Sequence, residues 1–216
     1  MIESIELRGV VPEVFAAEPP SASEVWTRPS VKFTRPGAYM VEADSGTGKS
    51  SLVSFIYGAR TDFRGDILFD GQSIRSFGID RWCELRCRSL AYLPQEMRLF
   101  PELTALENIQ VKNRLTGFRA DAEIMERLDM LGLSDKAGVP AARLSIGQQQ
   151  RVAIIRALCQ PFDFLLADEP VSHLDARNNS AVASMIAAEA EARGAAIIAT
   201  SVGNQLSINR FTLLRL

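Results

Sequence analysis

The chain has 216 residues, of which 47% are hydrophobic and 23% are charged, and its formal net charge is −2 at pH 7. This balance is typical of a folded globular protein and excludes a disordered chain. The slightly acidic charge gives no sign of nucleic-acid binding, so we expect no nucleic-acid partner. No apolar run reaches the roughly 18–20 residues that a membrane-spanning helix needs. The N-terminus lacks the pattern of a secretory signal peptide, so we expect a cytoplasmic location.

Three cysteines are present, Cys83, Cys87 and Cys159, and an odd number does not fit a disulfide framework. Cys83 and Cys87 would share one helical face at a spacing of four residues, which also fits a pair of metal ligands. Because the chain contains a single histidine and no second cysteine pair, we expect reduced, packed thiols rather than a metal site.

The first part of the chain contains runs of residues that predict β-strands. These runs are residues 2–15, 25–33 and 38–43. A stretch rich in proline and serine, residues 18–23, predicts a surface loop between the first two runs. The third run enters a glycine-rich loop, and an apolar helical period follows from Lys49 to Gly58, where the glycine fits the position just after a helix end.

The middle of the chain begins with a predicted hairpin and continues with helices. Asp70 and Gly71 join two β-prone runs, and Asp-Gly is a preferred pair in a type I′ turn. From about residue 80 to residue 143 the pattern is mainly helical.

The last part of the chain alternates helices with strands. We expect helices at residues 146–160 and 183–194, and strands at residues 162–168, 195–201 and 210–216. Strands that alternate with helices indicate a largely parallel α/β core. We therefore predict an α/β fold in one domain, residues 1–216. It would have a mostly parallel sheet, an N-terminal antiparallel β layer and a helical subdomain inserted at about residues 80–145.

A phosphate-binding loop is predicted between the third strand and the helix after it. Residues 43–50 match GxxxxGK[ST] except that Ala43 replaces the first glycine. Glycines let successive N–H groups point at phosphates, Lys49 supplies charge for the β- and γ-phosphates, and the Ser50 hydroxyl suits Mg²⁺. A left-handed φ at Ala43 would cost about 1–2 kcal/mol. The alternative is a turn that merely starts a helix. The predicted nucleotide-binding residues here are Ser45, Gly46, Thr47, Gly48, Lys49, Ser50 and Ser51.

An apolar strand that ends in two acids lies further along the chain. Residues 164–167 are apolar and are followed by Asp168 and Glu169, which is a Walker B pattern. Asp168 would hold the magnesium shell, and Glu169 would polarise an attacking water. The alternative is that the two acids only cap the strand. With the phosphate loop, this pair predicts a P-loop NTPase core.

Three further segments indicate a particular protein family. Residues 144–151 read LSIGQQQR, residues 171–175 read VSHLD, and Gln95 lies in the run AYLPQEMRLFPELTALENI. Together with the phosphate loop and the acidic pair, they resemble the signature motif, D-loop and Q-loop of the ATP-binding cassette family. In the signature, Ile146 replaces one glycine. The resemblance covers essentially the whole chain, with the motifs in the family's order.

This resemblance implies an ATPase with ATP and Mg²⁺ as cofactors, acting as a head-to-tail dimer of identical or related subunits. Each ATP would lie on the phosphate loop of one copy and under the signature motif of the other, near Ser145, Gly147 and Gln148. Gln95 would act both at the metal and in catalysis. The resemblance also implies a membrane permease docked on the helical subdomain near Gln95, and so a peripheral position at the inner face of the cell membrane.

The short chain and its LFPELTALENI stretch look most like the stand-alone ATPases of lipoprotein-release, macrolide-export and cell-division systems. The family's transport role implies that the permease, rather than this chain, selects the cargo.

The chain departs from the family at several positions. Ser201 stands where the family has a histidine that reaches the γ-phosphate, and we assign it that place in catalysis. Its hydroxyl is shorter and uncharged, and losing one well-placed donor costs about 10²–10³ in rate. Phe15 is the candidate for stacking on the adenine, with packing in the core as the alternative. His173 is predicted to be a loop residue rather than a substitute base.

Two functions remain open. The first is an ATPase subunit that drives a membrane transport complex. The alternative is a nucleotide-dependent binding or regulatory module that scarcely hydrolyses ATP, which the residues at positions 43, 146 and 201 favour. The intact Lys49, Asp168 and Glu169 favour the ATPase. A chromosome-type cassette would need a long coiled-coil insertion between Gln95 and Ser145, which is absent.

Overall fold

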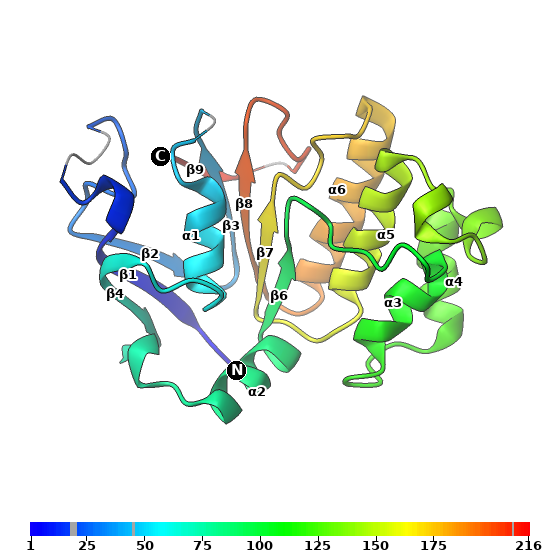
Figure 1. Cartoon of the computed structure of the whole chain (residues 1–216), viewed down its shortest axis with the longest axis horizontal. Helices are drawn as coiled ribbons and strands as arrows, with labels where there is room; N and C mark the ends of the chain where they lie inside the picture. The colour runs from blue at the N-terminus through cyan, green and yellow to red at the C-terminus, as the bar shows by residue number, and fades with distance from the viewer. Residues whose placement is uncertain (18–20, 45, 209) are drawn as a thin grey trace.

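The computed structural model describes residues 1–17, 21–44, 46–208 and 210–216. They form an antiparallel sheet, a parallel sheet and a set of helices, arranged from one end of the molecule to the other (Figure 1). In this described part of the chain, no helix combines the length and hydrophobicity needed to cross a membrane.

The antiparallel sheet has four strands in the order β2-β1-β4-β5. Their bounds are β1 Ser4–Pro12, β2 Ser30–Thr34, β4 Phe63–Phe69 and β5 Gln72–Ser73. The β4–β5 hairpin is confirmed: Phe69 pairs with Gln72, and both turn residues have positive φ, 49° at Asp70 and 83° at Gly71. A type I′ turn requires positive φ at both central positions.

The second sheet has five strands in the order β6-β7-β8-β3-β9, and each pairing in it is parallel. The strands are β3 Gly37–Glu42, β6 Leu90–Leu93, β7 Phe164–Asp168, β8 Ala196–Ser201 and β9 Thr212–Arg215. The α-helices are α1 Lys49–Ile56, α2 Ile79–Arg88, α3 Ala105–Asn113, α4 Asp121–Met130, α5 Ile146–Leu158 and α6 Ala176–Glu191. The predicted α/β fold with an N-terminal antiparallel layer is confirmed.

Helix α1 lies between the two sheets. Its apolar residues form one buried cluster with both: Leu52 and Phe55 pack with Ile5 and Ile67 of the antiparallel sheet, and with Phe164 of the parallel sheet. This packing fixes the start of α1, and therefore the loop before it, against the carboxyl end of β3.

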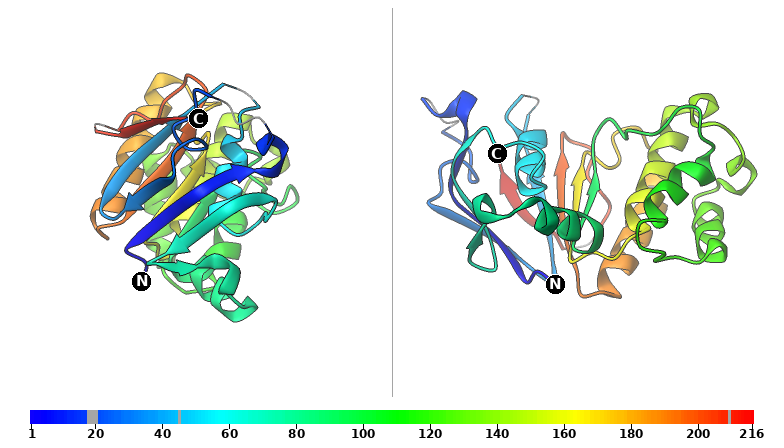
Figure 2. Two further views of the ribbon diagram at one scale, coloured as in Figure 1. Left: turned by 90° about the vertical axis from the view of Figure 1, so that its left-hand side faces the viewer. Right: turned by 60° about the horizontal axis from the view of Figure 1, so that its bottom comes forward.

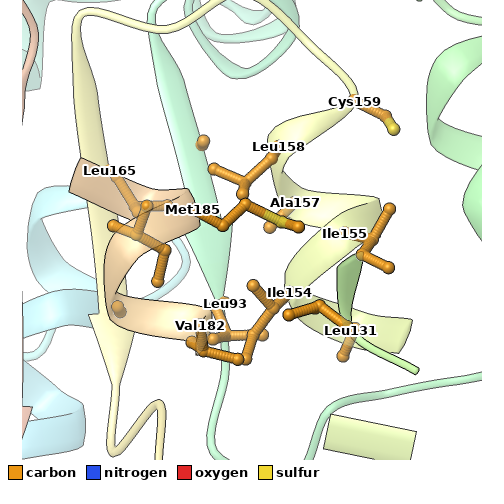
Figure 3. Packing of buried hydrophobic residues seen from close by; sticks show 14 of the residues in the cluster. Leu93, Leu131, Ile154, Ile155, Ala157, Leu158, Cys159, Leu165, Val182 and Met185 are labelled. Carbon is orange, nitrogen blue, oxygen red and sulfur yellow. The ribbon is translucent and has the colours of Figure 1, made fainter. Parts of the chain in front are cut away.

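The opposite face of the parallel sheet carries a second cluster, in which side chains from α5, α6 and β7 meet (Figure 3). Leu165 and Ala167 of β7 face this cluster, whereas Phe164 and Leu166 face α1, as the alternation of a strand buried on both sides requires. Helices α3 and α4 lie at the end of the molecule farthest from the antiparallel sheet (Figure 2).

Three local predictions differ from the structure. Helix α6 begins at Ala176 rather than at residue 183. Residues 25–33 do not form one strand: β2 begins only at Ser30, and Trp26 lies buried in the turn before it. The mainly helical stretch from residue 80 to 143 contains β6, which pairs with β7 at the edge of the parallel sheet. Four residues of β6 are too few for a period to distinguish a strand from the helices beside it.

Candidate active site

The phosphate loop connects β3 to α1. Gly46 and Gly48 have φ values of 85° and 99°, and Gly48 is the residue immediately before the helix. Only glycine adopts such left-handed values without strain. Among the described residues, the non-glycine positions with positive φ do not include Ala43, so its side chain costs no left-handed strain. The prediction for Ser45 lies outside the described residues.

The Lys49 ammonium lies against the backbone of this loop. Its Nζ donates to the carbonyl oxygens of Ala43 at 2.9 Å and Asp44 at 2.6 Å, and the residue is buried. The Thr47 hydroxyl donates to the Asp44 carbonyl at 2.9 Å. A positive charge, loop amides and a helix N-terminus thus meet at one place, which is the physical requirement for a phosphate site.

Two serines follow Lys49 in the first turn of α1. Ser50 is exposed, and the Ser51 hydroxyl accepts a hydrogen bond from Arg60 at 2.9 Å. The structure therefore leaves the Ser50 side chain facing solvent beside the phosphate loop, where a metal ligand would be needed.

Two aromatic rings flank the loop. A Cβ added at Gly48 would lie 3.4 Å from Phe15 and 3.4 Å from Trp26, and the Trp26 indole donates to the Thr47 carbonyl at 3.1 Å. Phe15 is half-buried. Trp26 was not predicted as a site residue, because its strand-like neighbours gave no sign of the turn that brings it onto the loop.

The acidic pair lies at the carboxyl end of β7. Asp168 is buried, pairs in register with Thr200 of β8, and its Oδ1 accepts the Thr200 hydroxyl at 2.6 Å. Glu169 follows with a φ of 48°. Burial raises the pKa of Tyr92 on neighbouring β6, and the Asp168 carboxylate raises it further, so the phenol stays neutral at pH 7.

Gln95 meets Glu169 across this edge of the sheet. The Gln95 Nε2 lies 3.4 Å from the Glu169 Oε2, a long hydrogen bond that joins the predicted Q-loop to the Walker B pair. The next turn is held by Arg156 of α5, whose guanidinium donates to the carbonyl oxygens of Met97 and, at 2.8 Å, Arg98. The helix thus fixes the conformation of the segment that carries Gln95.

The three residues predicted for the metal, Ser50, Gln95 and Asp168, offer only oxygen ligands of the kind that Mg²⁺ prefers. In the described ranges, no group of three or more His, Cys, Asp or Glu side chains is arranged to hold a metal ion. This donor set suits a Mg²⁺ that is bound partly through substrate phosphates, rather than in a cage of protein ligands.

The predicted signature motif lies at the start of α5. Ser145 caps the helix: its hydroxyl accepts the Gln148 N–H at 3.3 Å, and its own N–H donates to the Gln148 side chain at 2.9 Å. Ile146 is 55% exposed. A Cβ at Gly147 would lie 3.0 Å from the carbonyl oxygen of His173, so glycine lets the signature approach the D-loop closely. The helix N-terminus is a second position suited to an anion.

Ser201 lies at the end of β8. It is buried, and its hydroxyl donates to the Asn204 carbonyl at 2.9 Å. His173 is exposed, and its Nδ1 lies 3.0 Å from the Ser172 hydroxyl. The Ser172 hydroxyl also donates to the Glu169 carbonyl oxygen at 3.2 Å, so His173 is linked to the Glu169 backbone through Ser172.

The structure thus brings the phosphate loop, the acidic pair and Gln95 to the carboxyl edge of one parallel sheet, which is where ligands bind in such folds. The signature motif lies apart from the phosphate loop, at the start of α5 (Figure 1). This fold and site define a P-loop nucleotide-binding protein.

Comparison with known proteins gives the family. The model of the ABC transporter family matches residues 31–172, which is more than half of the chain. The chain therefore belongs to the ABC transporter family, in which it is an ATP-binding subunit of the ATPase type.

Solved structures with this fold include two of one protein. The first is described as the dimeric structure of a post-hydrolysis state of the ATP-binding cassette MJ0796 bound to ADP and Pi. Its sequence is 24% identical to this chain and its TM-score is 0.74, and the match covers 93% of this chain and 88% of the MJ0796 chain. The second is described as the dimeric structure of MJ0796, a bacterial ABC transporter cassette. Its sequence is 23% identical to this chain and its TM-score is 0.76, and the match covers 98% of this chain and 94% of the MJ0796 chain.

Proposed function

We propose that this protein is the motor subunit of a membrane transport complex, which binds Mg-ATP, closes on a second subunit and hydrolyses the nucleotide. One observation carries the proposal: the phosphate loop and the signature motif lie in separate places on the same chain. Each is suited to an anion, so a second copy turned by a two-fold axis would place the two motifs on opposite sides of one ATP.

The roles of the residues follow from their chemistry. Lys49 and the loop amides bind the phosphates, and Gly46 and Gly48 let the backbone approach them. Ser50, Asp168 and Gln95 would hold Mg²⁺, which neutralises charge that develops on the phosphates. Glu169 accepts a proton from the attacking water, and Gln95 orients that water. Ser145, Gly147 and Gln148 of the second subunit donate to the γ-phosphate. Ser201, which we place beside the γ-phosphate, offers a hydroxyl, and Phe15 offers a ring to the adenine.

The two MJ0796 structures support pairing because both are described as dimeric. We propose that this chain pairs head to tail in the same general way, with a second copy or with a related subunit.

The membrane partner would dock on the helical subdomain near Gln95. A permease segment docked there would sense the position of the helical subdomain at about residues 80–145. It would also hold the protein at the inner face of the membrane. The lipoprotein-release, macrolide-export and cell-division type remains our proposal for its class.

Light scattering on a gel-filtration column tests the pairing. The Glu169→Gln variant keeps the binding groups but lacks the base, so with Mg-ATP we expect a species of twice the 23.8 kDa chain mass. The double variant Lys49→Ala, Glu169→Gln is the control and should stay monomeric. A monomer in both variants at high protein concentration would contradict the pairing.

A second candidate rests on Ser201. Because its hydroxyl is buried and engaged by the Asn204 carbonyl, it is a weak replacement for a γ-phosphate ligand. The protein would then be an ATP-gated binding module with little turnover. Dimer formation without phosphate release would favour this function.

A further inference from the structure

Glu169 has an unusual backbone conformation for the residue that we propose as the base. Its φ of 48° lies in the left-handed region, which costs a non-glycine residue about 1–2 kcal/mol. Such conformations persist only where surrounding groups hold them, and they concentrate at functional sites.

Two buried side chains hold the Glu169 backbone. Its N–H donates to the Thr200 hydroxyl oxygen at 3.1 Å, and its carbonyl oxygen accepts from the Gln150 Nε2 at 3.1 Å. Thr200 is 0% exposed and Gln150 is 2% exposed, so water does not compete for these bonds. The Ser172 hydroxyl and N–H also donate to this carbonyl oxygen, at 3.2 and 3.3 Å, so the backbone is held from both sides.

Each of the two side chains also bonds a second functional group. The Thr200 hydroxyl donates its proton to Asp168 at 2.6 Å, so one hydroxyl connects both acids of the pair. The Gln150 Oε1 accepts the His173 N–H at 3.0 Å. Gln150 lies on α5, five residues after Ser145, so it connects the helix of the signature motif to the D-loop and to Glu169.

We propose that Thr200 and Gln150 are positioning residues that hold Glu169 in its strained conformation and so aim its carboxylate at the attacking water. The inference rests on the proposed function, because it assumes that Glu169 is the base. Loss of the Thr200 bond frees the Glu169 N–H, and loss of the Gln150 bond removes one of three donors to the Glu169 carbonyl, so either loss would loosen the left-handed backbone and let the carboxylate move. A displacement of about 1 Å at a reacting group is enough to lower a rate 10²-fold.

Variants that remove one bond and keep the volume test this proposal. Thr200→Val removes the hydroxyl, and Thr200→Ser retains it. Gln150→Met removes the amide at similar length. Thr212→Val is the matched control, because it makes the same change at an exposed position in β9.

Three readouts separate positioning from simple stability: kcat for phosphate release, the dissociation constant of ATP measured without Mg²⁺, and amide hydrogen exchange at Glu169 measured by mass spectrometry. For Thr200→Val and Gln150→Met we expect kcat to fall by about 10–100-fold. We also expect faster exchange at Glu169 and an ATP dissociation constant within about twofold of the parent, since Lys49 and the loop are unchanged. Thr200→Ser and Thr212→Val should keep kcat within about threefold.

Several outcomes would overturn the proposal. One is an unchanged kcat in both Thr200→Val and Gln150→Met, and another is an equal loss of kcat in Thr200→Ser. If Thr200→Val does not fold, the kcat values of Gln150→Met and Thr200→Ser still test the proposal. If the parent shows no turnover above Glu169→Gln, the proposed hydrolysis itself fails. In that case amide hydrogen exchange at Glu169 is the remaining test, and an unchanged exchange rate in the variants would overturn the inference.

Discussion

Lys49 is buried, and within the described residues its ammonium donates to two carbonyl oxygens of its own loop. A buried ammonium without a counter-ion is costly unless strong acceptors surround it. Phosphate oxygens are better acceptors than carbonyls because they carry charge. We therefore expect Lys49 to contribute directly to the affinity of the loop for nucleotide phosphates.

Lys49→Ala should weaken ATP binding by about 2 kcal/mol or more, roughly 30-fold, which is the contribution of a hydrogen bond to a charged group. Isothermal titration with ATP measures this change. Lys32→Ala is the matched control, because Lys32 is exposed on β2, away from the loop, and should leave the affinity unchanged. An unchanged affinity in Lys49→Ala would exclude the phosphate-loop assignment.

Residues that belong to a short local motif can be predicted from the sequence, whereas residues that act through contacts with distant parts of the chain cannot. Gly48 and Lys49 lie within one short pattern, and the structure places Gly48 immediately before α1 and Lys49 as its first residue. Trp26, Gln150 and Thr200 act through contacts with residues far along the chain, and nothing in their own neighbourhood distinguishes them. The proposed reacting groups can therefore be predicted from the sequence, whereas the side chains that hold them cannot.

At the scale of elements, an ionic cluster joins the helical end of the molecule to the core. Glu189 of α6 pairs with Arg119 just before α4, with Arg127 on α4 and with Arg193. Burial raises the pKa of Glu189, but the Arg127 hydrogen bonds and the charges of Arg193 and Arg119 outweigh this effect. The net pKa lies below the ordinary value of 4.5.

Glu189→Gln should lower the free energy of unfolding by about 3 kcal/mol at pH 7, because it leaves three guanidinium groups without their shared carboxylate. Glu123→Gln is the control: its side chain is 42% exposed and pairs with Arg119, and the amide can still accept the Ala120 N–H, so the loss should cost under about 1 kcal/mol. Urea denaturation of both variants measures the difference. Equal losses would show that the cluster is an ordinary surface ion pair.

The pH dependence of this contribution has a definite sign. A carboxylate whose pKa is lowered by folding stabilises the protein above its unfolded pKa, and the contribution disappears as the pH falls through the folded value. The stability gap between the parent and Glu189→Gln should therefore be complete at pH 7 and shrink below about pH 4.5. Urea denaturation repeated down to pH 3 measures it. A gap that widens on acidification would contradict the lowered pKa.

Elements with a clear period or turn signal were predicted correctly, whereas strand β6 was not. The β4–β5 hairpin and α5 carry local signals in Asp70-Gly71 and the Ser145 cap. Strand β6 is formed because its four residues pair with β7, a partner more than 70 residues away. Its identity as a strand is thus a property of the tertiary fold.

At the scale of the whole molecule, the separation of the phosphate loop from the signature motif is the central feature. The parallel sheet places Lys49, Asp168 and Glu169 at one edge, whereas α5 carries Ser145 elsewhere on the same chain. A monomer would hold the phosphate loop of one ATP site and the signature motif of the other. If two copies complete the sites, activity must depend on how often two copies meet, and ATP would act as a contact between them.

Steady-state phosphate release from Mg-ATP, measured over a range of protein concentrations, tests this account most directly. Glu169→Gln is the blank, because it keeps the binding groups and lacks the base. We predict release above the blank by about 100-fold or more, with a rate per copy that rises with concentration until dimers saturate. Release equal to the blank at every concentration, or a rate per copy that stays constant down to concentrations at which only monomers exist, would contradict the account.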